Sequence, residues 1–181
     1  AEERNTPTSR CRPASTAAVL AGLVGGETLL SGQHTGQLYR RLMANDFTGL
    51  QQLFTAFFAS IPHDWYRNNP IARYEGYYAS VFYSHFAALG LDIRLEDATN
   101  KGRIDMAVLF NGQVYLFEFK VVELVPEGKA LQQLRDRAYA DKYRARGEPI
   151  HLIGVELSRE SRSVVGFEVD SVGARSGERH G

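Results

Sequence analysis

Two apolar segments separated by Asn111-Gly112 constrain the fold of this chain more than any other feature. Residues 103–110 and 114–121 are rich in aliphatic and aromatic side chains, as is typical of β-strands. The dipeptide Asn-Gly is a strong signal for a tight turn between antiparallel strands. The sequence therefore predicts a β-hairpin within an apolar sheet.

Three charged side chains interrupt this hairpin. Alternate residues of a strand share a face, so Glu118 and Lys120 point to the same side, away from the flanking phenylalanines. Folding of the hairpin can bring Asp105 alongside them. Such charges are costly to bury without partners, but a divalent cation would neutralise the carboxylates, and hydrolysis of a phosphodiester would use all three groups. On a solvated edge strand they would form an ordinary ion pair that contributes little to stability.

A helix is predicted before the hairpin, over residues 72–89. Its apolar stripe recurs at helical spacing and consists of Ala79, Phe82, Phe86 and Leu89, with Tyr78 close by. Glu75 is the one acidic residue at the start of this stripe. We expect the hairpin carboxylates to lie on the sheet face beside this helix, so that Glu75 turns towards them and adds a third carboxylate that can reach a metal ion or its water. A favourable interaction with the helix dipole is the alternative explanation.

A second helix is predicted after the hairpin, over residues 128–146, with Gly147 as its stop signal. Its apolar stripe consists of Leu131, Leu134 and Ala138. Gln133 lies slightly off this stripe, and the adjoining faces carry Arg137, Tyr139, Tyr143 and Arg144. Arginine and tyrosine together suit phosphate contact and base stacking. A solvated helix with i,i+4 ion pairs is the alternative.

The rest of the chain predicts further helices and strands. Residues 37–61 show apolar faces for one or two helices, with a break at Asp46 as a candidate N-cap. The predicted strands are residues 91–96, 103–110, 114–121, 150–157 and 164–169. The helix between the third and fourth strands makes a βαβ crossover, so those two strands should be parallel, with a right-handed connection.

In this order, the charged residues and their context resemble the PD-(D/E)XK nuclease superfamily. The resemblance runs from about Leu38 to Val169 and is carried by Glu75, Gly102-Arg103-Ile104-Asp105, Phe117-Glu118-Phe119-Lys120 and residues 130–143. It is closest to the bacterial DUF1703 group, in which a nuclease-like domain follows an AAA-type ATPase-like region. Ile104 replaces the usual proline, which leaves the chemistry possible. The resemblance implies an α/β fold with a restriction-endonuclease-like mixed β-sheet core (αβββαβ) flanked by helices, after an N-terminal helical segment.

The resemblance also implies roles for single residues. Asp105, Glu118 and the backbone carbonyl of Phe119 would bind Mg²⁺ or Mn²⁺. Glu75 would hold a second ion or a second-shell water, and Lys120 would be the catalytic lysine. The implied catalytic group is therefore Asp105, Glu118, Lys120 and Glu75. The residues expected to contact nucleic acid or to position the helix are Gln133, Arg137, Tyr139 and Tyr143.

The implied activity is metal-dependent hydrolysis of a phosphodiester, with DNA as the expected substrate. A non-catalytic module that keeps the nuclease fold and binds nucleic acid or a protein is the main alternative. A third interpretation is an accessory domain of an ATPase-like protein, whose activity depends on a region outside this chain.

Charge and cysteine content bound these functions. The 21 basic and 21 acidic residues balance, giving a formal net charge of 0, so any surface that attracts DNA must be local. Cys11 is the single cysteine, which excludes an internal disulfide and favours a cytoplasmic location. The chain lacks GxSxG, GxxxxGK[ST] and GxGxxG patterns, which disfavours serine hydrolases and nucleotide- or dinucleotide-dependent enzymes.

The predicted domain organisation has three parts. Residues 1–36 are expected to be disordered or fragmentary, residues 37–170 to form the nuclease-like domain, and residues 171–181 to be a flexible tail. The apolar run at residues 17–24 is too short to span a membrane, so no membrane partner is expected. The chain does not begin with methionine, and we interpret it as a piece of a longer protein.

Overall fold

The computed structural model describes residues 32–61 and 75–173. Its elements in chain order are α2 (Gly32–Met43), α3 (Phe47–Ser60), α4 (Glu75–Ala87), β1 (Asp92–Thr99), β2 (Gly102–Phe110), β3 (Gln113–Val122), α5 (Lys129–Asp136), α6 (Asp141–Arg144), β4 (Ile150–Ser158) and β5 (Val164–Val172). The predictions for residues 1–31, 62–74 and 174–181 lie outside the described residues. None of the described helices has the length and apolar character needed to cross a membrane.

The five strands form one mixed sheet in the order β1-β2-β3-β4-β5. β3 pairs antiparallel with β2 and parallel with β4, and the remaining neighbours are antiparallel. The parallel pair is joined through α5, which confirms the predicted crossover and the mixed α/β core (αβββαβ). In the hairpin turn, Asn111 and Gly112 have φ values of 51° and 68°, the left-handed conformation that a two-residue type I′ turn requires.

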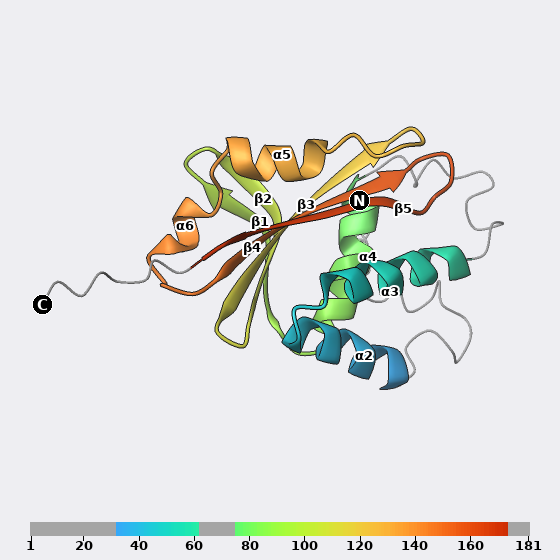
Figure 1. The fold of residues 1–181 in the computed structure, drawn as a ribbon, viewed down its shortest axis with the longest axis horizontal. Helices are drawn as coiled ribbons and strands as arrows, with labels where there is room; N and C mark the ends of the chain where they lie inside the picture. The colour runs from blue at the N-terminus through green and yellow to red at the C-terminus, as the bar shows by residue number, and fades with distance from the viewer. Residues whose placement is uncertain (1–31, 62–74, 174–181) are drawn as a thin grey trace, which may run out of the picture.

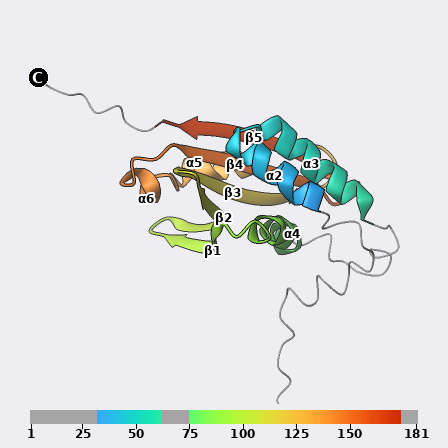
Figure 2. The same ribbon diagram turned by 90° about the horizontal axis from the view of Figure 1, so that it is seen from below.

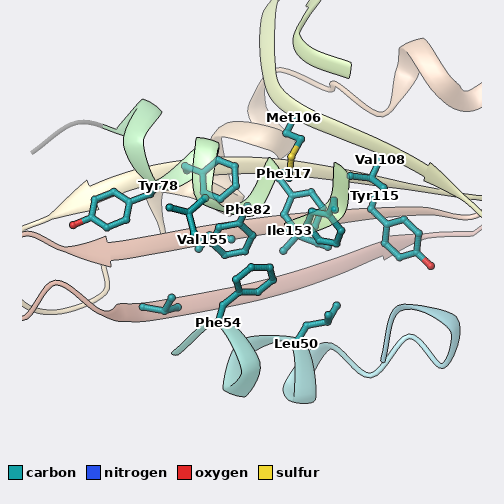
Figure 3. Close-up of a cluster of buried hydrophobic side chains, with 14 of the residues drawn as sticks. Leu50, Phe54, Tyr78, Phe82, Met106, Val108, Tyr115, Phe117, Ile153 and Val155 are labelled. Atoms are coloured by element: carbon teal, nitrogen blue, oxygen red, sulfur yellow. The ribbon is translucent and has the colours of Figure 1, made fainter. Parts of the chain in front are cut away.

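Helices cover both faces of the sheet, with α5 on one face and α2, α3 and α4 on the other (Figures 1 and 2). Aromatic rings fill the α3–α4 side, where Phe54 of α3 stacks on Phe82 of α4 with ring centroids 3.7 Å apart (Figure 3). Phe82 in turn meets Phe119 of β3 at 4.9 Å. Complete burial of such a side chain contributes about 1.5–3 kcal/mol to folding, so this cluster fixes α4 against the centre of the sheet.

The predicted break in the first helical segment is confirmed at Asp46. Its Oδ1 accepts a hydrogen bond from the Gly49 amide at 2.8 Å, which satisfies one free N–H at the start of α3. The preceding helix α2 begins at Gly32, ahead of the predicted start at residue 37. The chain therefore forms two helices over this segment, as the alternative of one or two helices allowed.

The single helix predicted over residues 128–146 is wrong, because the chain forms two helices there. Between α5 and α6, Ala138 adopts a left-handed conformation with φ 46°, and the Tyr139 amide donates back to the Leu134 carbonyl at 3.4 Å. This is a helix ending in which glycine usually takes the left-handed position. The turn allows the rings of Tyr139 and Tyr143 to be buried against the sheet.

Candidate functional site

The two central strands separate where the charged residues lie. Cα pairing between β2 and β3 runs from the turn to Met106 and Phe117 and ends there. Beyond this point the Asp105 carboxylate takes the place of a backbone acceptor, because its Oδ2 accepts the Phe119 amide at 2.8 Å. The folded hairpin therefore holds Asp105 beside β3, next to the Glu118-x-Lys120 segment.

The face on which this segment lies differs from the prediction. Phe117 and Phe119 belong to the cluster packed against α4, so strand alternation directs Glu118 and Lys120 to the opposite face. That face is covered by α5, whose Leu131 and other apolar residues pack there. The prediction that the carboxylates lie on the face beside the helix of Glu75 is therefore wrong for Glu118, which lies on the α5 face.

Glu118 is the most deeply buried charged side chain of the site, at 1% exposure. Its Oε1 accepts from Lys120 Nζ at 3.3 Å and from the Gln133 side-chain amide on α5. Its Oε2 is buried and has no hydrogen-bond partner. Burial, and secondly the nearby charge of Asp105, raise the pKa of Glu118 to about 7. The site therefore contains a carboxylate oxygen that lacks a donor or cation.

Lys120 links this buried carboxylate to α4. Its Nζ lies 3.4 Å from Oε2 of Glu75, the first residue of α4. The side chain of Glu75 is 46% exposed. Burial alone would lower the pKa of Lys120, but the surrounding carboxylates raise it above its ordinary value, Glu118 first. The structure thus brings Glu75, Asp105, Glu118 and Lys120 to one end of β3, with the lysine held in its charged form.

The pKa of Asp105 is also raised. Its burial is the largest cause and outweighs the Phe119 amide and the Lys120 charge, which both favour the carboxylate form. The charges of Glu75 and Glu96 raise the pKa of Asp105 a little further, and the charge of Asp105 in turn raises the pKa of Glu118. A bound cation would relieve both carboxylates at once.

The residues fit one divalent cation better than two. Among residues 32–61 and 75–173, no three acidic, histidine or cysteine side chains gather so that they could hold a metal ion. Glu75 is engaged with Lys120, which leaves Asp105 and Glu118 as the paired carboxylates. Mg²⁺ in proteins is often held by one or two carboxylates together with water, and the unpaired Oε2 of Glu118 suits such an ion. The predicted roles of Glu75 and of the Phe119 carbonyl as ligands stay predictions.

A pocket of about 480 Å³ opens beside Lys120. Its lining residues are Glu75, Lys120, Val121, Val122, Glu123, Glu127, Lys129 and Arg159. Two of its cations are already paired, Lys129 with Glu127 and Arg159 with Glu123. The pocket therefore gives access to the lysine without presenting a strongly basic surface.

The residues predicted for nucleic-acid contact divide into exposed and buried ones. Arg137 is exposed, donates to the Tyr139 hydroxyl at 3.2 Å and forms no ion pair with any carboxylate in the described part of the chain. Tyr139 and Tyr143 are 1% and 2% exposed, so neither ring can stack on a base. Of the two roles expected for these tyrosines, burial leaves only the positioning of α5 and α6.

Sequence reasoning missed Glu156, which is 2% exposed on β4. Its carboxylate accepts backbone amides at the start of α5. A single acid within the apolar segment 150–157 was the available signal, of the same kind that drew attention to Glu118. Its partners are distant in sequence, so no local pattern revealed them.

Comparisons with known proteins give one family model and one relative. A family model described as the PD-(D/E)XK nuclease superfamily matches residues 73–167, the segment that holds α4, all the site residues and the beginning of β5. A protein of Azotobacter chroococcum mcd 1, described as "Uncharacterized protein in vnfD 5'region", is 83% identical over 141 residues. The match covers 78% of this chain but 27% of that protein, so the chain spans about a quarter of the length of this relative. No solved structure matches the chain.

Proposed function

Because the chain belongs to the PD-(D/E)XK nuclease superfamily, we propose that it is a metal-dependent phosphodiester hydrolase acting on DNA. The observation that supports this most directly is the buried, unpartnered Oε2 of Glu118 beside Asp105 and Lys120. A buried polar atom without a partner typically costs about 1–3 kcal/mol. Such a cost is understandable at a site that binds an ion during its function.

Asp105 and Glu118 would hold Mg²⁺ or Mn²⁺, with the Phe119 carbonyl as a further oxygen ligand. When bound, such an ion lowers the pKa of a coordinated water and stabilises negative charge on the phosphodiester. Lys120, kept protonated by its carboxylate neighbours, would orient the attacking water and offset developing charge. Glu75 contacts the Lys120 ammonium and would fix its position. Gln133 occupies Oε1 of Glu118, which leaves Oε2 for the ion.

Recognition of the substrate would depend on a few cations. Arg137 is exposed on the α5 side and has no carboxylate partner among the described residues, so its guanidinium is available for a phosphate. DNA as the substrate, membership of the DUF1703 group and a cytoplasmic location are parts of this proposal. So is an ATPase-like region or partner, for which the greater length of the relative leaves room.

One observation favours a non-catalytic binding module as the second candidate. Lys129 and Arg159, the cations beside Lys120 in the pocket, are paired with glutamates, which weakens attraction for a polyanion. A protein partner that exchanges these ion pairs would be compatible with this pocket.

Cleavage of plasmid and single-stranded DNA with Mg²⁺ or Mn²⁺ tests the proposal. The variants are Asp105→Asn and Lys120→Ala, with Asp170→Asn as a matched control, because Asp170 is a carboxylate paired with Arg135 away from the site. Cleavage that is lost in both site variants and on chelation, but kept in the control, supports the nuclease. Cleavage that survives both site variants would refute the site.

Metal binding decides the remaining outcomes. An absence of cleavage together with Mn²⁺ binding that requires Asp105 would indicate a complete site that needs a partner. An absence of both cleavage and Mn²⁺ binding would favour the non-catalytic module.

A further inference from the structure

Glu156 is a buried carboxylate that the proposed reaction does not use. Its two oxygens accept four consecutive backbone amides that lead into α5, from Glu127, from Gly128 at 3.0 Å, from Lys129 at 2.6 Å and from Ala130 at 3.2 Å. Burial alone would raise the pKa of Glu156, but these amides together lower it below its ordinary value. A carboxylate of β4 therefore satisfies the free N–H groups at the start of α5.

Strand register connects this contact to the candidate site. In the parallel ladder, Glu156 pairs with Lys120 and Gly154 pairs with Glu118, so all four residues share the face covered by α5. A side chain at position 154 could not be accommodated, because a Cβ there would lie 2.3 Å from the backbone nitrogen of Leu131. α5 thus rests directly on the β4 backbone, and Glu156 holds its first turn.

Gln133 lies one turn beyond Lys129 on the same short helix, and its amide donates to Oε1 of Glu118. Because α5 has only eight residues, a carboxylate that fixes its first turn also fixes the position of Gln133. We propose that Glu156 is a positioning residue that acts through α5 to hold the Gln133 amide on Glu118. Its effect on metal affinity rests on the proposed function, whereas its effect on Gln133 does not.

A second anchor of α5 provides a matched control. Arg135, near the end of the helix, pairs with Asp170 of β5 at 2.9 Å, and both side chains are about half exposed. Asp170→Asn removes a contact between α5 and the sheet without touching the first turn. A general loosening of α5 would affect Gln133 in both variants, whereas positioning by Glu156 would affect it only when Glu156 is changed.

The first readout is the side-chain amide of Gln133 in ¹H–¹⁵N NMR spectra of the metal-free chain, assigned by its loss in Gln133→Ala. In Glu156→Gln we expect its two proton signals to move to the positions of a solvent-exposed glutamine, and in Asp170→Asn we expect no movement. If Glu156→Gln does not fold, Glu156→Asp, which keeps the charge but shortens the reach, serves instead. Unmoved signals in a folded Glu156 variant, or equal movement in the control, would overturn the proposal.

The second readout is Mn²⁺ affinity, measured by calorimetry. Loss of a group that orients a ligand typically weakens metal binding about 10-fold or more, and we expect such a loss in Glu156→Gln. The same substitution in a Gln133→Ala background should cause no further loss; an equal further loss would contradict action through Gln133. A wild-type chain that binds no Mn²⁺ would refute the proposed metal site, while the NMR result would still decide the role of Glu156.

Discussion

Glu118 and Glu156 lie on neighbouring parallel strands, on the same face of the sheet, and both are almost completely buried. Their surroundings differ. Glu156 receives four backbone amides and its pKa is lowered, whereas Glu118 keeps one oxygen without a partner and its pKa is raised to about 7. Burial alone therefore does not distinguish a carboxylate with a structural role from one with a proposed functional role. The number of donors that the fold supplies makes the distinction.

The largest expected difference between the two glutamates is in cleavage. Glu118→Gln removes a proposed metal ligand, and because a metal ion contributes several kcal/mol to such reactions, cleavage should fall by at least about 100-fold. Glu156→Gln should reduce cleavage only by about 10-fold, through Gln133. Initial rates on plasmid DNA at a Mn²⁺ concentration well below saturation measure both. Equal losses of cleavage in the two variants would contradict the different roles proposed for Glu118 and Glu156.

Stability should show the reverse order. Glu156→Ala leaves backbone amides of α5 without their carboxylate, and a buried donor that loses its partner typically costs about 1–3 kcal/mol. Glu118→Gln should not destabilise the metal-free chain, because it replaces a poorly satisfied buried charge with a neutral amide. Urea unfolding without metal measures these changes. Glu168 is exposed, so Glu168→Gln is a control that should change the free energy of unfolding by almost nothing. A larger loss in Glu118→Gln than in Glu156→Ala would contradict the comparison.

Acid should separate the two residues further. The pKa of Glu156 is lower in the folded chain than in the unfolded chain, where it is about 4.3, so its stabilisation is complete above that pH and is lost as the pH falls through the folded value. The Glu156→Gln variant should therefore lose less stability than the wild type between about pH 5 and pH 3. Urea midpoints across this range measure the effect, and parallel curves would exclude it.

The smallest effect is expected at the exposed anchor of α5. The Arg135–Asp170 pair is solvated on both sides, and exposed ion pairs contribute about 0–1 kcal/mol. Asp170→Asn should lower the free energy of unfolding by no more than that, and should leave cleavage unchanged. If Asp170→Asn lowered the free energy of unfolding as much as Glu156→Ala does, the Arg135–Asp170 pair and not Glu156 would be the main contact that holds α5 on the sheet.

Local chemistry made much of the fold predictable. The Asn111-Gly112 turn, the strand segments and the Asp46 cap each depend on residues adjacent in sequence, and the structure confirms them. The end of α5 was missed because Ala138, and not a glycine, takes the left-handed position, where burial of the following tyrosines outweighs its steric cost.

The site was only partly predictable for a related reason. Strand alternation placed Glu118 and Lys120 on one face, but which helix covers that face depends on tertiary packing. Two sets of contacts depend on the distance between α5 and β4: the hydrogen bond from Gln133 to Glu118, and the hydrogen bonds from four backbone amides to Glu156. Gly154 permits this short distance because it lacks a side chain. The sequence alone does not reveal this constraint, because it arises only from the packing of α5 on β4.

The parallel pairing of β3 with β4 implies an order of assembly during folding. A two-residue hairpin forms within about 1–10 μs, so Asp105, Glu118 and Lys120 can meet while the chain is still largely unfolded. β4 can join only after the whole crossover through α5 has closed, a slower step because loop entropy is lost before the new contacts compensate for it. In a newly synthesised chain, the charged residues of the hairpin would therefore lie together before β4 pairs and Glu156 binds the first amides of α5. Under the proposed function, we expect competence for metal-dependent cleavage to appear only with this last step.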